Sequence, residues 1–243
     1  MDETLARLVD RAWDLFLKTP EDRRFLIGIG GIPGSGKTTL SKRLTAALNA
    51  RHAAAFPAAT AAVAAFVPMD GFHYTRARLD AMADPATAHA RRGAEFTFDG
   101  AGFARLVRRL AEPLPPAGSA GSAGVVLAPS FDHALKDPRE DDIAVAPTHR
   151  IVVLEGNYTL LNRPPWSEAA ALFSFTVFVS VPREVARARL AARHLAAGIV
   201  DTPEAADRRA VENDLPNGDE VIRLRIPHVD EVVESRDDAG WAN

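Results

Sequence analysis

The sequence predicts an α/β fold in which helices cover both faces of a parallel sheet. Short apolar runs alternate with segments of helical periodicity along the 243 residues, a pattern typical of strand–helix–strand units. A glycine-rich segment separates the first apolar run from the helix that follows it. Acidic residues end two later runs. Both features indicate a ligand site at the carboxyl edge of the sheet, where open parallel sheets bind their ligands.

Composition and charge exclude several classes of function. The chain is 47% hydrophobic and 25% charged, as in ordinary globular proteins, and its net charge of -3 argues against a nucleic-acid binder driven by a basic field. The absence of cysteine excludes disulfides and thiol catalysis. Acidic residues interrupt the first segment, and no run is long and apolar enough to span a membrane. We therefore expect a cytoplasmic protein without a membrane partner, and the oligomeric state stays open.

The predicted elements form one domain over residues 1–243. An N-terminal helix falls within 1–19, where apolar side chains recur at helical spacing until Thr19-Pro20. A Pro/Gly/Ser/Ala-rich stretch over 112–124 predicts a flexible loop, and 52–63 a variable connection. The remaining predictions are strands over 24–30, 64–69, 150–154, 175–181 and 229–234, and helices over 38–49, 103–110 and 184–197.

The strongest functional signal is a phosphate-binding loop. The segment Gly31-Ile32-Pro33-Gly34-Ser35-Gly36-Lys37-Thr38 matches G-x-x-x-x-G-K-S/T at every specified position, after an apolar run and before a helix. Glycines let successive N–H groups point at phosphate oxygens, and the helix N-terminus adds partial positive charge. A chance glycine turn is the plain alternative, which the flanking strand and helix disfavour. We predict nucleotide binding by Gly31, Pro33, Gly34, Ser35, Gly36, Lys37, Thr38 and Thr39.

Lys37 and Thr38 have distinct expected roles. The Lys37 ammonium reaches the outer phosphates, and the Thr38 hydroxyl ligates Mg²⁺. We also expect Lys37 to face solvent when the site is empty.

Four classes of P-loop protein are candidates for this loop. A GTPase needs an N-K-x-D segment and an ABC-type ATPase needs L-S-G-G-Q; neither is present. A motor or AAA-type machine normally has a longer chain. A small-molecule kinase needs a carboxylate near the acceptor hydroxyl. Asp70 offers one, because it ends the predicted strand over 64–69 and would point into the nucleotide cleft. A turn-initiating aspartate before Gly71 is the alternative.

An ordered set of segments reveals a resemblance. After the P-loop come Met69-Asp70-Gly71-Phe72-His73, Arg92-Gly93 with Phe98-Asp99, Pro129-Ser130-Phe131-Asp132-His133 and Leu154-Glu155-Gly156-Asn157-Tyr158. Over roughly 24–234 the chain resembles the phosphoribulokinase/uridine kinase superfamily, which also holds bacterial-type pantothenate kinase. It is most similar to the nucleoside/nucleotide kinase, or fructose-kinase-like, branch. The resemblance implies a P-loop NTPase fold with a small helical lid over 183–217, and the use of ATP and Mg²⁺.

The resemblance also implies catalytic roles. Asp70 matches the general base that acts on the acceptor hydroxyl and helps hold magnesium, and Glu155 matches an acid that completes this environment. Arg189 and Arg193 match lid arginines that close over the phosphates; a solvated basic face is the alternative for this helix. The implied catalytic residues are Asp70, Lys37, Glu155, Arg189 and Arg193, and the implied metal ligands are Thr38, Asp70 and Glu155.

The acceptor pocket departs from the uridine kinase pattern. The implied substrate-binding residues are Asp70, His73, Arg92, Phe131, His133, Asn157 and Tyr158. However, Phe131 and His73 stand where tyrosines are expected, and Lys136 replaces a base-contacting histidine. These changes disfavour uridine and leave a sugar, a polyol or a pantothenate-like alcohol open. His73 and His133 could equally be structural loop histidines, and we expect 213–217 to form a plain turn.

The sequence therefore predicts an ATP-dependent kinase that phosphorylates a hydroxyl of a small metabolite. The rival is an ATP-binding regulatory or chaperone-like P-loop protein without a small-molecule acceptor. Asp70 discriminates between them, since a pure binder needs no base at that position.

Overall fold

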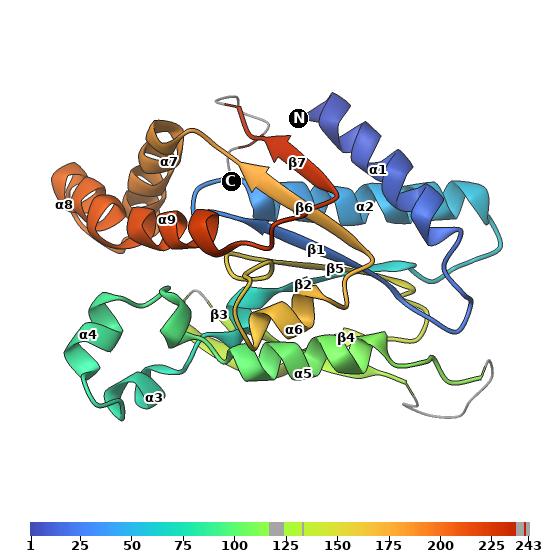
Figure 1. Cartoon of the computed structure of the whole chain (residues 1–243), viewed down its shortest axis with the longest axis horizontal. Coiled ribbons are helices and arrows are strands. Elements are labelled where there is room, and N and C mark those ends of the chain that lie inside the picture. Colours follow the sequence, from blue (N-terminus) through green and yellow to red (C-terminus); the bar gives the residue numbers. More distant parts are fainter. Residues whose placement is uncertain (117–123, 133, 237–240, 242–243) are drawn as a thin grey trace.

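A computed structural model describes residues 1–116, 124–132, 134–236 and 241, and a five-stranded parallel sheet lies at its centre (Figure 1). The strand order is β2-β5-β1-β6-β7, and each neighbouring pair is parallel. The predicted α/β fold class is confirmed. The strands are β1 Phe25–Gly31, β2 Ala64–Pro68, β5 Ile151–Gly156, β6 Phe175–Ser180 and β7 Glu231–Glu234.

Two helices cover one face of the sheet. α1 (Asp2–Phe16) and α2 (Lys37–Ala55) bury Leu8, Trp13 and Leu44 against it. Because strand side chains alternate between faces, Phe25, Ile27 and Ile29 of β1 join this core. α2 continues to Ala55, so the connection predicted over 52–63 begins later than expected: the alanine-rich sequence there extends the helix.

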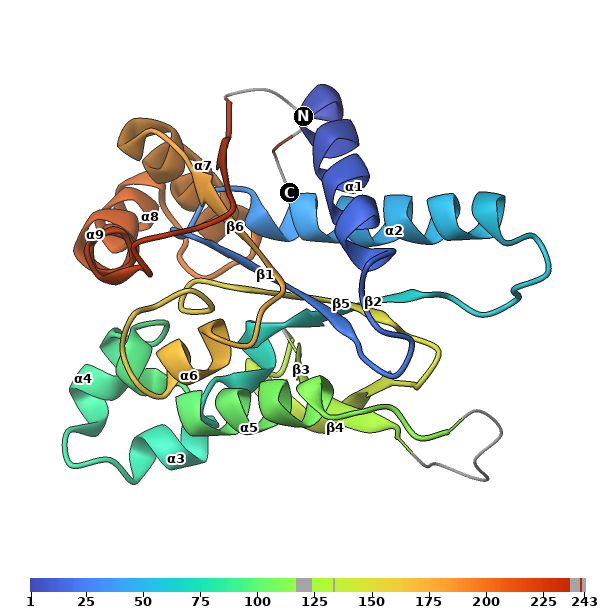
Figure 2. The ribbon, with the colours of Figure 1, turned by 45° about the vertical axis from the view of Figure 1, so that its right-hand side comes forward.

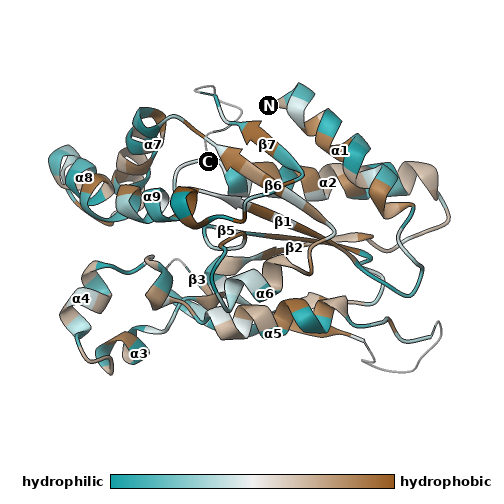
Figure 3. Ribbon diagram, viewed as in Figure 1, coloured by the Kyte–Doolittle hydropathy of each residue, from teal (hydrophilic) through white to brown (hydrophobic). Residues whose placement is uncertain are grey.

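The other face is covered by α5 (Gly100–Ala111) and α6 (Trp166–Ala170), which contribute Phe103 and Trp166 to a second core. Glycines of β1 allow close packing on this side. A Cβ at Gly28 would lie 2.3 Å from the Phe173 ring, so no larger residue fits there without a shift. Figure 3 shows the apolar strands enclosed between these layers.

Two helical lobes lie on the side where the strands end (Figures 1 and 2). The first, the upper lobe, contains α7 (Arg183–Ala196), α8 (Pro203–Arg209), the π-helical turn η3 (Ala210–Asp214) and α9 (Leu215–Leu224). The second, the lower lobe, contains α3 (Arg76–Asp80) and α4 (Pro85–Ala90). The short 3-10 turns η1 (Met69–Phe72) and η2 (Glu95–Thr97) flank the lower lobe in the chain.

An antiparallel hairpin, absent from the predictions, stands apart from the main sheet. β3 (Val126–Asp132) pairs with β4 (Asp137–Val145). β4 is rich in charge and mostly exposed, so it shows none of the apolar pattern by which a buried strand is recognised. Residues 117–123 of the loop predicted over 112–124 lie outside the described residues. None of the described helices combines the length and apolar character that crossing a membrane requires.

Candidate active site

The phosphate loop joins β1 to α2 at the carboxyl edge of the sheet. Gly34 (φ 78°) and Gly36 (φ 82°) adopt left-handed conformations that glycine takes readily. Space is also restricted: a Cβ at Gly34 would lie 2.8 Å from the Ala186 carbonyl oxygen. The loop is closed by a 3.2 Å hydrogen bond from the Ser35 N–H to the Ile32 carbonyl. The glycines predicted to shape the loop are therefore needed for both conformation and packing.

Lys37 is buried beside Glu155, so the expectation that it faces solvent is wrong. Its Nζ donates to the Ile32 carbonyl at 3.3 Å and lies 4.0 Å from Glu155 Oε1. Glu155 ends β5, opposite Ile29 of β1, and is 5% exposed. The Lys37 side chain turns back toward its own loop, where Nζ meets the Ile32 carbonyl. Glu155, on the neighbouring strand β5, supplies the opposite charge.

Asp70 completes an acidic edge around Lys37. It lies in η1, directly after β2, and β2 pairs with β5 so that Pro68 is opposite Glu155. Burial raises the pKa of Glu155 to about 7; Lys37 acts against this rise and Asp70 adds to it. Burial lowers the pKa of Lys37, opposed chiefly by Glu155 and then by Asp70. The structure thus brings the predicted cation, Lys37, together with the two predicted carboxylates, Asp70 and Glu155, at adjacent strand ends.

A cavity of about 270 Å³ adjoins the loop. It is lined by Gly34, Gly36, Lys37, Thr38, Arg189, Ala192, Arg193, Ala196 and Trp241. Both predicted lid arginines line it, but they differ. Arg189 donates to the Gly34 carbonyl at 3.3 Å, to Ser235 Oγ at 2.8 Å and to the Arg236 carbonyl. The guanidinium of Arg193 makes no hydrogen bond within the described part of the chain, although its backbone carbonyl accepts one from Ala197 N–H. Of these two arginines, only Arg193 therefore has its guanidinium available to a phosphate. Arg189 instead joins the phosphate loop to residues 235–236.

On the acceptor side, His73 lies between two rings. Its ring centroid is 3.9 Å from that of Phe98 and 4.8 Å from that of Phe131, and its Nδ1 contacts the Asp70 carbonyl at 2.8 Å. His73 and Phe131 therefore come together next to Asp70, as the sequence predicts. His133 lies outside the described residues.

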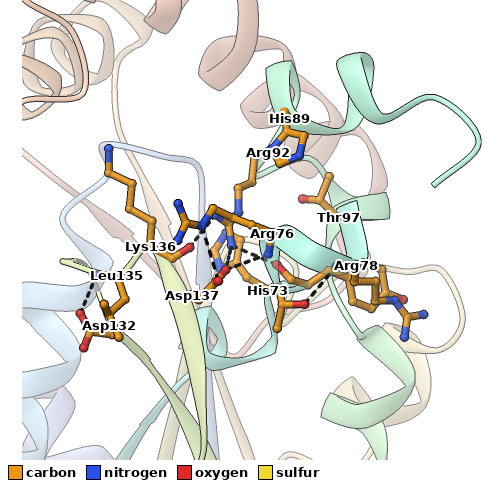
Figure 4. Close-up of polar contacts among 12 residues, drawn as sticks. His73, Arg76, Arg78, His89, Arg92, Thr97, Asp132, Leu135, Lys136 and Asp137 are labelled. Carbon is orange, nitrogen blue, oxygen red and sulfur yellow. Dashed lines mark hydrogen bonds and ion pairs between the residues drawn. The ribbon is translucent and has the colours of Figure 1, made fainter. Parts of the chain in front are cut away.

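The guanidinium of Arg92 is hydrogen-bonded to the β3–β4 hairpin (Figure 4). It donates to the Lys136 carbonyl at 2.6 Å, the Tyr74 carbonyl at 3.0 Å and Asp137 Oδ1 at 3.1 Å. Its side chain holds the β3–β4 connection against the segment that follows η1. The side chain of Lys136 extends away from Asp137 (Figure 4). Arg92, expected to bind the acceptor, is thus engaged by groups of the protein in this structure.

The two residues after Gly156 have different environments. Tyr158 is fully buried, and its hydroxyl donates to the Gly93 carbonyl at 2.8 Å. This burial corrects the expectation that Tyr158 faces an acceptor: it supports the segment next to Arg92. Asn157 Oδ1 is buried and has no hydrogen-bond partner among the described residues. Asn157 Oδ1 therefore stays available to accept a hydrogen bond near the end of β5.

The segment over 213–217, expected to be a plain turn, instead connects the two lobes. It forms the end of η3 and the start of α9. Arg91 of the lower lobe donates from Nε to Asn213 Oδ1 at 3.0 Å and from Nη2 to Asn217 Oδ1 at 2.8 Å. Asp214, between them, contacts His194 Nε2 at 2.8 Å. Sequence reasoning missed this arrangement because the partners lie more than a hundred positions apart.

A buried lysine in a glycine loop, between a parallel strand and a helix, defines a P-loop nucleotide-binding protein. Acidic residues stand at the ends of two neighbouring strands, Asp70 after β2 and Glu155 on β5. The model of the phosphoribulokinase/uridine kinase family matches residues 26–197, and the chain belongs to this family. The resemblance seen in the sequence is thereby confirmed.

Known proteins similar to the chain carry kinase names. The ATP-dependent kinase-like protein notR' of Aspergillus versicolor is 55% identical over 65% of this chain and 90% of its own length. C227.14 of Schizosaccharomyces pombe, whose name places it provisionally among uridine kinases, is 43% identical over 86% of this chain and 82% of its own. A solved structure, provisionally assigned as a fructose transport system kinase of Silicibacter sp. TM1040, has a TM-score of 0.77 at 33% identity, covering 94% of this chain and 98% of that chain.

Proposed function

We propose that this protein moves the γ-phosphate of Mg-ATP to a hydroxyl of a small metabolite. The grouping of Lys37, Asp70 and Glu155 at the carboxyl edge carries the proposal, because phosphoryl transfer needs a cation at the phosphates and a carboxylate at the acceptor. The name of the Aspergillus relative supports the use of ATP.

Each residue of the site has a defined task. The N–H groups of the phosphate loop bind the phosphates, and Lys37 and Arg193 neutralise charge that develops during transfer. The α7–α9 lobe excludes water from the reacting groups when it closes. Asp70 orients the acceptor hydroxyl and takes its proton.

The donors available for a cation suit magnesium. Thr38, Asp70 and Glu155 offer hard oxygen atoms, which Mg²⁺ prefers. In the described part of the chain no group of three acidic or histidine side chains could hold a metal by itself. This agrees with Mg²⁺, which commonly takes one or two protein carboxylates and completes its shell with substrate phosphates and water. Bound Mg²⁺ would neutralise phosphate charge during transfer.

Asp70→Asn tests the role of the base. The amide keeps the size of the side chain but accepts no proton at neutral pH. Turnover should fall by ~10²–10⁴-fold, the usual contribution of general-base assistance, while metal-free ATP binding changes little. Steady-state ADP release and ATP titration measure both. Asp14→Asn, on the exposed face of α1, is the control. Unchanged turnover would make Asp70 a turn residue, and lost metal-free ATP binding would put it in a different pocket.

The acceptor class is tested by a panel of purified compounds. We expect sugars and polyols to be phosphorylated with kcat/KM at least on the order of tenfold above uridine and cytidine, because Phe131 and Lys136 replace the groups expected to bind a base. The fructose-related name of the bacterial neighbour supports this choice, and the uridine kinase name of the yeast relative supports the opposite one. Efficient uridine phosphorylation would contradict it. ATP binding without any acceptor-dependent ADP release would favour a regulatory or chaperone-like protein.

A further inference from the structure

The lining of the cavity beside the phosphate loop is of two kinds. Lys37, Thr38 and Arg193 contribute polar and cationic groups, whereas Ala192, Ala196 and Trp241 contribute apolar surface. The P-loop motif explains none of the apolar lining. A nucleoside triphosphate has the same division, with a polyanionic tail and a flat, largely apolar base.

Trp241 is held tightly against the loop. It is 1% exposed and belongs to the core beneath α1 and α2. A Cβ at Gly36 would lie 2.9 Å from the Trp241 carbonyl oxygen and 3.2 Å from Cε3 of its indole. The ring therefore borders the phosphate-binding backbone directly.

Arg189 secures the chain directly after β7. Through Ser235 Oγ (2.8 Å) and the Arg236 carbonyl it joins residues 235–236 to α7, and through the Gly34 carbonyl it joins both to the loop. The Ser235 N–H also donates to the Ser180 carbonyl, at 2.7 Å. Arg189 thus acts as a positioning residue for residues 235–236.

The indole of Trp241 has an unused donor. Its Nε1 is buried and has no hydrogen-bond partner among the residues that the structure describes. Buried polar groups are almost always paired, and an unpaired one costs free energy. An unpaired N–H on a residue that lines a ligand cavity therefore points to an acceptor supplied by the ligand.

We propose that Trp241 completes the nucleotide site and that the nucleoside end of a purine nucleoside triphosphate contacts the small part of its indole that lines the cavity. The inference rests on the proposed use of ATP. It extends the site beyond the matched family region, which ends at residue 197. The loop holds the phosphates, and Trp241 contacts the base.

The test compares ATP with inorganic tripolyphosphate, both without metal, by calorimetric titration. Trp241→Ala should weaken ATP binding by on the order of tenfold, as loss of a base–aromatic contact does, and leave tripolyphosphate binding unchanged. Trp241→Phe keeps an aromatic face and should restore most of the affinity. Trp13→Phe, in the core at α1, is the control and should change neither titration.

Tryptophan fluorescence gives an independent readout. ATP should change the emission of the wild-type protein, and this change should be lost in Trp241→Phe but kept in Trp13→Phe. Equal weakening of ATP and tripolyphosphate would overturn the proposal, since Trp241 would then only support the loop; unchanged affinity for both would overturn it as well. A wild-type protein that binds neither ligand would overturn the proposed function itself.

Discussion

The nucleotide side and the acceptor side of this site are built differently. The phosphate-binding part of the nucleotide side is one continuous segment, β1, glycine loop and the start of α2, and its lysine is buried against a neighbouring strand. The acceptor side gathers η1, the β3–β4 hairpin and the lower lobe, which long side chains hold together. The proposed phosphate site is thus encoded locally, whereas the proposed acceptor side depends on contacts between distant segments.

The arginines illustrate this difference. Arg92 and Arg189 were both expected to contact ligands, yet carbonyl oxygens occupy each of them. An arginine has five donors in a fixed fork, which lets it join several backbone carbonyls at once. In this fold Arg92 positions the hairpin and Arg189 positions residues 235–236.

A large effect is expected on the nucleotide side. Lys37→Ala removes the buried cation of the loop and should lower turnover by on the order of 10²–10³-fold, the loss typical of one group that stabilises transition-state charge. The fold should persist, because Glu155, whose pKa is already raised, can take a proton. Turnover and circular dichroism are measured beside Lys42→Ala, which changes an exposed lysine of the same helix. Near-normal turnover would mean that the loop is not catalytic.

A smaller effect is expected where the two lobes meet. Arg91→Ala removes two hydrogen bonds to Asn213 and Asn217. Bonds to a charged donor contribute ~1.5–3 kcal/mol, so urea unfolding should reveal a loss of that order. The KM for the best acceptor should rise several-fold, while metal-free ATP affinity is kept. Arg208→Ala, exposed on α8, is the control. If ATP affinity falls as much as acceptor affinity, the two sides are not separable.

The smallest effect concerns pH. Glu155 has an ordinary pKa of 4.5 and a folded pKa of about 7, so between these values the folded protein binds a proton that the unfolded chain lacks. Stability of the metal-free, nucleotide-free protein should therefore decline as pH rises through this window. Glu155→Gln, which cannot titrate, should flatten the decline in urea unfolding with a chelator present. Glu184→Gln, exposed at the start of α7, should keep it. An equal slope in all three proteins would place the titration elsewhere.

The sequence by itself determined the parallel sheet, the phosphate loop, the acidic strand ends and the family. These features depend on periodicity and spacing within short segments, so they can be recognised without knowledge of the packing. Asp70 was found because parallel strands carry their carboxyl ends to one edge, and the role of Glu155 came from the family resemblance.

Only the tertiary structure decided which side chains are available to a ligand. It buried Lys37 and Tyr158, occupied Arg92 and Arg189, and brought Trp241 to the phosphate loop. Burial and hydrogen bonding are set by partners distant in the chain, such as Gly34 and Arg189, which lie 155 positions apart. A polar residue has the same letter in the sequence whether its donors are satisfied by the protein or left for a substrate. The packing of distant segments makes that distinction.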